Sequence, residues 1–227
     1  MITITATGIN NTQGIITTGQ GDNTLSATAI SSSATLSSTY TSTLASATPG
    51  NQALALAVAN ATAQATDKAI AIDNTNGLIN LGNGNDTIQA TAQAIDKAIA
   101  INNTNGLINL GNGNDTLIAK ATGSQSYGIF GGTVDMGAGN DQVIASSFGG
   151  GVKINTGDGN DYIEGFGDAT INGGKGFDTL SLGSYNKNDF NISFGANSSV
   201  IFQRDGQTLT AYGIEKFVFA DTSWTLV

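Results

Sequence analysis

The chain of 227 residues contains no cysteine and no histidine, and it has a single proline. The lack of cysteine excludes disulfides, thiolate metal sites and cysteine nucleophiles. The lack of histidine removes the commonest general base and the commonest ligand for transition metals. Glutamate is also scarce, because Glu164 and Glu215 are the only two. An enzyme on a solenoid scaffold would need clustered acids or a basic residue in a groove, so we expect no enzymatic activity.

Positive charge and long apolar runs are scarce as well. The chain has eight Lys and Arg and 17 Asp and Glu, which gives a net charge of −9. The basic residues are scattered along the sequence. We therefore expect no nucleic-acid partner. No segment is long and apolar enough to span a bilayer, so no transmembrane segment is expected. The N-terminal sequence MITITATGIN has neither the basic leader nor the apolar core of a cleavable signal peptide.

What the chain does contain is glycine, 31 residues of it, and a long internal repeat. The unit Thr62–Ala90 is repeated as Thr91–Ala119 with only four differences: Thr66/Ile95, Asp73/Asn102, Ile88/Leu117 and Gln89/Ile118. A repeat of this length and fidelity is typical of a solenoid, in which each copy is one coil that stacks on the next.

Each repeat contains the hexad L-G-N-G-N-D, preceded and followed at two residues' distance by an aliphatic residue. Related hexads occupy residues 136–141, 156–161 and 173–178, and a weaker one occupies residues 18–23 with its Asp and Asn exchanged. The candidate metal ligands are the glycines at the second and fourth positions and the aspartate at the sixth position of five hexads: Gly82, Gly84, Asp86, Gly111, Gly113, Asp115, Gly137, Gly139, Asp141, Gly157, Gly159, Asp161, Gly174, Gly176 and Asp178.

These residue types in this pattern suit calcium. Glycine permits positive φ, which turns backbone carbonyls into one concavity, and calcium takes six to eight oxygen ligands. One hexad supplies only part of that shell, so a cation between two stacked hexads would draw ligands from both. Without calcium the stacked carboxylates would repel one another. The plainer alternative is that Asp and Asn serve here only as turn residues.

The hexads resemble the RTX family, the haemolysin-type calcium-binding repeats with the nonapeptide GGxGxDxUx. The resemblance implies a right-handed parallel β-roll, calcium as the cofactor, and export to the cell surface or medium without a cleavable signal peptide. This chain departs from the family's nine-residue spacing: its last five hexads follow each other after 29, 26, 20 and 17 residues. We therefore expect one calcium column rather than two.

The spacing divides the chain into degenerate coils over residues 1–66, calcium-binding coils over 67–182 and a cap over 183–227. We expect Gly50 to mark a ligand-free coil between the hexads of Gly19 and Gly82, with Leu56 in the inward position. The alternation over residues 53–66 favours a strand, although its many alanines would otherwise favour helix. Wide coils should have three sides: the strand after the hexad, the AIAI strand and the LIN strand. Beyond Leu117 the third side should give way to residues 123–132, so that the solenoid tapers.

The last segment differs in kind, because it is rich in aromatic residues. Strands are expected over residues 190–194, 200–203 and 209–212, with Asp205-Gly206 as a hairpin turn. Residues 213–221 resemble the family's closing motif, and we expect an antiparallel β cap over the open end of the solenoid, which the resemblance also makes a candidate secretion signal.

The favoured function is a secreted, calcium-binding structural protein that assembles head to tail into a filament, sheath or surface layer. The N-terminal ITITATG has no charge or proline to block an exposed strand edge, although residues 1–10 could instead fold over the first coil as a cap. The alternative function is a free-standing calcium-dependent adhesion module that contacts a cell surface or polysaccharide. An ice-binding face is disfavoured, because Gln142 and Tyr162 interrupt the column of Thr24, Thr87 and Thr116.

Overall fold

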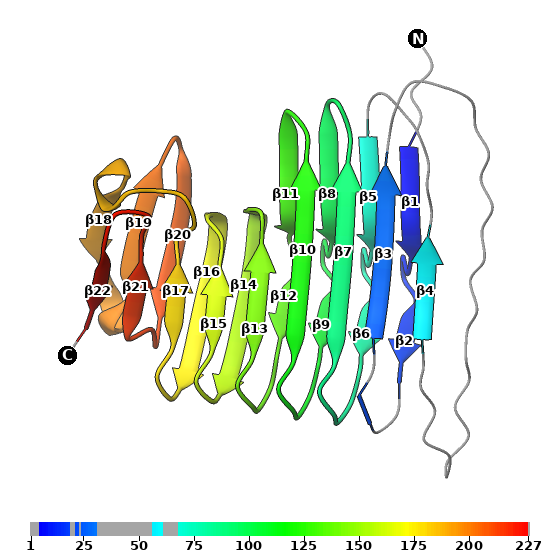
Figure 1. The fold of residues 1–227 in the computed structure, drawn as a ribbon, viewed down its shortest axis with the longest axis horizontal. Coiled ribbons are helices and arrows are strands. Elements are labelled where there is room, and N and C mark those ends of the chain that lie inside the picture. Colours follow the sequence, from blue (N-terminus) through cyan, green and yellow to red (C-terminus); the bar gives the residue numbers. More distant parts are fainter. Residues whose placement is uncertain (1–4, 19–20, 23, 31–55, 61–67, 227) are drawn as a thin grey trace.

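The computed structural model describes residues 5–18, 21–22, 24–30, 56–60 and 68–226, and within them the fold is almost entirely β (Figure 1). The chain winds back and forth between two stacked sheets, and most neighbouring strands within each sheet are parallel. This arrangement is a parallel β-solenoid, as the repeat predicts.

One coil of the solenoid is seen in the second repeat. β8 (Lys97–Asn102) and β9 (Leu107–Asn109) lie in the 13-stranded sheet, and after the hexad β10 (Thr116–Thr122) lies in the 9-stranded sheet. Strand β10 pairs with β7 (Thr87–Gln93) in register, so that Leu117 lies beside Ile88. The sequence offset of this pair is the 29-residue period, so one repeat is one coil.

The remaining strands follow the same plan. The 13-stranded sheet also holds β1 (Thr5–Asn10), β2 (Ile15–Thr17), β5 (Lys68–Asp73), β6 (Leu78–Asn80), β11 (Gln125–Phe130), β12 (Thr133–Asp135), β14 (Phe148–Asp158), β16 (Gly167–Lys175), β18 (Asn191–Phe194), β19 (Val200–Arg204) and β20 (Gln207–Tyr212). The 9-stranded sheet also holds β3 (Thr24–Ile30), β4 (Leu56–Asn60), β13 (Gln142–Ala145), β15 (Tyr162–Glu164), β17 (Thr179–Ser181), β21 (Lys216–Val218) and β22 (Ser223–Thr225).

The prediction of three sides per wide coil is wrong. The AIAI and LIN strands of one coil follow each other within the same sheet, separated only by the turn of residues 103–106. In the later coils they fuse: β14 pairs with β11 at one end and with β12 at the other. A wide coil therefore has two layers, and the Asn-Gly corner is an interruption of one layer (Figure 1).

The expected loss of the third side after Leu117 is also wrong. Residues 125–130 form β11, which pairs with β8, and β12 pairs with β9, so this coil keeps all three strands. The coil shortens one turn later, where β13 has four residues and β15 has three, against seven in β7 and β10.

Alanine fills one part of the interior, and larger aliphatic residues fill the other. Next to the hexads the core is filled by fully buried Ile and Leu, such as Ile79, Ile108 and Leu110. Farther up the coil, buried alanines of both sheets line the interior, including Ala92 and Ala100. Small side chains let the two sheets pack closely there, which accounts for the long run of alternating alanines.

The N-terminal coils stack in a different order from the one predicted. The first hexad's coil lies directly against the second, since β1, β2 and β3 pair with β5, β6 and β7. Strand β4 lies on the other side of β3, outside this stack, and in that register Ala57 rather than Leu56 is level with the buried Leu25. Gly50 lies outside the described residues. Matching turns on both coils favour the observed order, because they satisfy each other's polar groups.

The C-terminal segment both extends and closes the solenoid. Strands β20 and β21 add one more parallel coil, on β16 and β17. Strands β18, β19 and β22 then pair antiparallel, as expected of a cap, and Asp205 and Gly206 form the hairpin turn with positive φ. The part of the chain that the structure describes has only the short 3-10 helices η1 (Lys187–Asp189) and η2 (Ala196–Ser198), and no helix there could cross a membrane.

Candidate metal centre

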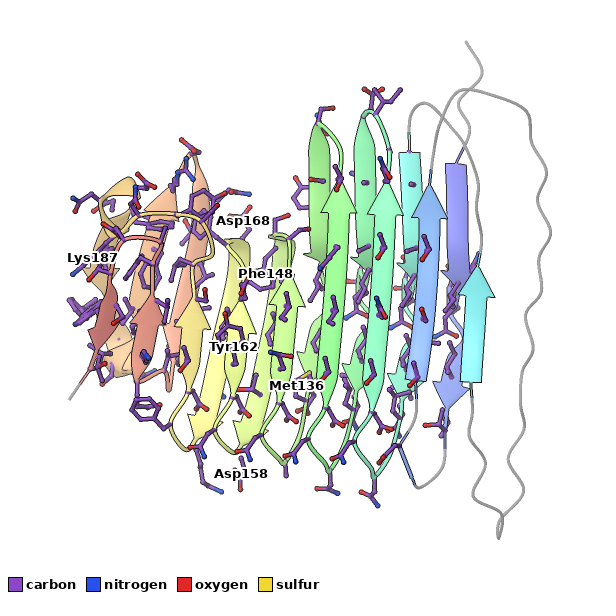
Figure 2. The ribbon with its side chains drawn as sticks, in the orientation of Figure 1. Met136, Phe148, Asp158, Tyr162, Asp168 and Lys187 are labelled. Carbon is purple, nitrogen blue, oxygen red and sulfur yellow. The ribbon has the colours of Figure 1, made fainter. Side chains whose placement is uncertain are left out.

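The hexads form a single row along one edge of the solenoid, the lower edge in Figure 1. Their third residues form parallel bridges from Asn83 to Asn112, then to Ala138 and to Asp158. In Figure 2, Asp158 projects outward from this row, whereas Met136, the first residue of its hexad, lies toward the interior and is fully buried. The structure thus brings the five predicted hexads together.

The predicted glycines are required by the stacking. Gly111 and Gly113 both have positive φ, and a Cβ on them would lie 1.7 and 1.8 Å from the carbonyl oxygens of Gly82 and Gly84. The same close approach recurs in the following coils. Each hexad therefore presents two carbonyl oxygens along the stack, and only glycine lets the next coil approach them.

The five aspartates form a hydrogen-bonded ladder. The main-chain N–H of Asp86 donates to Oδ1 of Asp115 at 2.7 Å, and that of Asp115 donates to Oδ1 of Asp141 at 2.7 Å. The same bond joins Asp141 to Asp161 and Asp161 to Asp178, each at 2.8 Å. All five side chains are at most 2% exposed. A carboxylate that repeats at every coil is thus held inside the turn.

A second ladder runs in the opposite direction on the outside of the turns. The N–H of Asn114 donates to Oδ1 of Asn85, and the N–H of Asn140 donates to Oδ1 of Asn114, both at 2.7 Å. In the first hexad Asp22 takes the asparagine's place and accepts from the N–H of Asn85 at 2.7 Å. The exchange of Asp and Asn noticed in that hexad therefore preserves this outer ladder. Its Asn23 lies outside the described residues.

The burial of the aspartate ladder changes the pKa of its carboxyl groups. The pKa of Asp115 is raised to about 6, mainly by burial and to a smaller extent by the charges of Asp86 and Asp22. Burial likewise raises the pKa of Asp141 to about 7 and that of Asp178 to about 6. In each case the hydrogen bond from the neighbouring backbone N–H opposes the rise. Desolvation prevails because no lysine or arginine of the described residues forms a salt bridge with these carboxylates.

Four of the ladder carboxylates each have one oxygen left over. Oδ2 of Asp115, Asp141, Asp161 and Asp178 is buried and has no hydrogen-bond partner among the described residues. The salt bridges in the described part of the chain are Lys175–Asp158 and Arg204–Asp205, and neither reaches the ladder. A buried acceptor of this kind costs about 1–3 kcal/mol, and more when it is charged.

These features fit a hard cation with oxygen ligands. Within the described residues no three acidic side chains converge on one point, so a cation would take one or two carboxylates and complete its shell with backbone carbonyls. The unpartnered Oδ2 atoms and the stacked glycine carbonyls are such ligands, and calcium accepts this mixture. The donor set has no nitrogen or sulfur, which disfavours zinc and copper.

Sequence reasoning missed two features beside the hexads. The first is a buried ladder of Asn11, Asn74 and Asn103, in which each Nδ2 donates to the next coil: 2.6 Å from Asn11 to Asn74 and 2.7 Å from Asn74 to Asn103. The motif N-T-x-G, repeated at residues 11, 74 and 103, is the signal that could have revealed it. The second is Glu215, whose Oε2 accepts from the N–H of Asp178 at 2.7 Å.

Comparison with known proteins does not assign this chain to a family. No family model, no curated protein and no solved structure matches the chain.

Proposed function

We propose that this protein is a secreted, calcium-binding structural protein of RTX type, whose coils are held together by calcium ions along the hexad row. The observation that carries the proposal is the column of buried aspartates, four of which, Asp115, Asp141, Asp161 and Asp178, have an Oδ2 without a hydrogen-bond partner and without a salt bridge among the described residues. A second support is the pair of glycine carbonyls that each hexad directs toward the next.

The energetic argument concerns the whole column. Neighbouring carboxylates in coils about 4.8 Å apart repel by about 3 kcal/mol at an effective dielectric near 20. A divalent cation between them reverses the sign of this interaction. Calcium binding is then coupled to folding, because an unfolded chain offers no preformed site. Affinities of roughly 10⁻⁴–10⁻³ M suit an extracellular module, and a right-handed, tapering roll is the form we propose for the stack.

The difference between the two ends of the solenoid supports the proposed structural role. Among the described strands, β1 and β2 each have only one partner, so both leave one edge free at the N-terminal end. The other end carries the antiparallel strands β18, β19 and β22. Unlike ends favour a head-to-tail contact, which propagates as a filament unless its rotation closes a ring.

Sedimentation velocity and negative-stain electron microscopy, in millimolar calcium and in chelator, test this function. We expect large, regular assemblies in calcium that dissociate into slower, expanded monomers in chelator, and no assembly when magnesium replaces calcium. A compact monomer in calcium at high protein concentration contradicts the assembly. A compact monomer in chelator contradicts the role of calcium.

A further inference from the structure

The last coil of the solenoid lacks a hexad yet keeps a carboxylate at the hexad's final position. The register between β16 and β20 pairs Asn172 with Tyr212, and that between β17 and β21 pairs Thr179 with Lys216. Between these pairs the earlier coil has the six residues 173–178, whereas the last coil has only residues 213–215, Gly-Ile-Glu. Glu215 thus directly precedes its strand, as Asp178 precedes β17.

The shortened turn lies directly on the last hexad. A Cβ on Gly173 would lie 2.1 Å from the carbonyl oxygen of Gly213, and Gly213 itself has a φ of +54°. Ile214 is buried. A turn that is three residues shorter follows a tighter path, and glutamate's extra methylene lets its carboxylate reach the ladder. Its bond of 2.7 Å from the N–H of Asp178 matches those between the aspartates.

The contact between these two coils brings a glycine carbonyl close to a buried carboxylate oxygen that has no hydrogen-bond partner among the described residues. Asp178 is fully buried, and its Oδ2 has no hydrogen-bond partner among the described residues. Its hexad begins with Gly173, where the earlier ones begin with Leu, Met or Thr. A Cβ on Gly173 would lie 2.6 Å from that Oδ2, so only glycine lets the Asp178 carboxylate and the Gly213 carbonyl approach the backbone so closely here.

No positive charge on the described residues balances this pair of carboxylates. The side chain of Lys175 pairs with Asp158 on the outer side of the row, at 2.9 Å. Two acidic side chains and the adjacent glycine carbonyls form an all-oxygen donor set, which suits a hard divalent cation.

We propose that Glu215 and Asp178 form a terminal site for a divalent cation of calcium type, which fastens the C-terminal cap to the solenoid. Glu215 is then the sixth carboxylate of the column and its last. This inference rests on the proposed function, because it assigns the same cation to a site outside the hexads. The attachment of the cap to the solenoid then depends on a cation at this site.

The cap contains its own reporter. Trp224, the only tryptophan, lies opposite Phe217 in the antiparallel pair β21–β22, with ring centres 5.4 Å apart. Lys187, labelled at the cap in Figure 2, has its Nζ 5.1 Å from the Trp224 ring. Phe217 follows Glu215 by two residues, so release of this turn should change the surroundings of the tryptophan.

Tryptophan fluorescence and far-UV circular dichroism, followed in one calcium titration, test the proposal. The informative variant is Glu215→Gln, because glutamine can still accept the N–H of Asp178 but carries no charge. Its matched control is Glu164→Gln, which removes one charge from the outer face of β15, where Glu164 accepts a hydrogen bond from Tyr162. Both titrations are run on the full chain.

We expect Glu215→Gln to move the midpoint of the fluorescence transition to about tenfold higher calcium, since ligand charge sets calcium affinity. The dichroism midpoint should move much less, and Glu164→Gln should leave both unchanged. Equal midpoints for the two variants would overturn the terminal site while leaving the proposed function intact. A wild-type chain without any response to calcium would overturn both.

Discussion

The N–H of Asp115 donates to Oδ1 of Asp141 in the next coil, while Oδ2 of the same Asp141 is buried and has no hydrogen-bond partner among the described residues. One oxygen of the carboxylate thus fixes the register of the stack, and the other is available to a ligand. Asparagine could provide the first function equally well, as the outer ladder shows at Asn85 and Asn114. The proposed binding of a cation would give the carboxylate at this buried position a function that asparagine lacks.

The first prediction concerns pH in the absence of calcium. Asp115, Asp141 and Asp178 have pKa values of about 6, 7 and 6 in the folded chain, above the ordinary value of 3.8. The folded state then binds more protons than the unfolded state, so stability is highest below about pH 4 and falls as pH rises toward 7. Thermal melts in chelator should show this fall.

In saturating calcium the trend should reverse, because calcium and protons compete for the same carboxylates. The melting temperature should then rise between pH 4 and pH 7. Parallel melting curves with and without calcium over this range would contradict the assignment of the buried carboxylates as ligands.

The second prediction is that Asp141→Asn changes stability in opposite directions with and without calcium. Asparagine keeps the Oδ1 acceptor but removes the buried charge and its repulsion from both neighbours. In chelator the variant should be more stable by about 1–3 kcal/mol. In calcium it should be less stable, since two adjacent sites lose a ligand.

Urea unfolding in calcium, together with the β signal in circular dichroism that each chain retains in chelator, measures this effect. Asp135→Asn is the control, because Asp135 carries the same charge in β12, outside the hexads. An effect of the same sign in both conditions would show that Asp141 is not a ligand.

The third prediction separates the two roles of glycine. Gly113 and Gly151 both have positive φ, but a Cβ on Gly113 would lie 1.8 Å from the Gly84 carbonyl oxygen, whereas a Cβ on Gly151 meets nothing within 4 Å. Gly151→Ala should cost about 1 kcal/mol from backbone strain alone. Gly113→Ala should cost several times more and weaken calcium binding, which urea unfolding and calorimetric titration can compare. Equal costs would mean that the hexads do not stack so closely.

The fourth prediction concerns the buried asparagine ladder. Asn74 is fully buried, accepts from Asn11 and donates to Asn103. Asn74→Ala removes a buried hydrogen bond from each partner and should destabilise the chain by about 2–4 kcal/mol, with calcium affinity little changed. Asn109→Ala in the outer column of β9 is the control. Similar losses from the two substitutions would contradict a ladder.

Much of the fold could be predicted because the repeat fixes the register. Once Thr62–Ala90 and Thr91–Ala119 are aligned, each strand must lie beside its copy, and the described parts of both units do so. The number of layers could not be predicted in this way. Whether the turn at Asn103 starts a new side or interrupts a strand depends on how the coil packs across its interior, which the spacing does not encode.

One part of the candidate site could also be predicted from the sequence, and another part could not. The aspartate column follows from the hexads, because aligned positions in a solenoid stack. Glu215 escaped prediction because its turn has three residues instead of six, so no hexad could be aligned there. Its role depends on distance in space: the pairing of β17 with β21 brings Glu215 to Asp178. The order of the N-terminal coils was missed because β4 could be placed on either side of β3 by spacing alone.

The most direct test of a calcium-dependent fold is far-UV circular dichroism of the full chain at pH 7.5, first in excess chelator and then during a calcium titration. At this pH the carboxylates of Asp115, Asp141 and Asp178 are mostly ionised, so repulsion is strongest without metal. We expect a largely unfolded spectrum in chelator, a cooperative gain of β signal in millimolar calcium, and no gain with magnesium at the same concentration. A full β spectrum in chelator that calcium leaves unchanged would contradict the account.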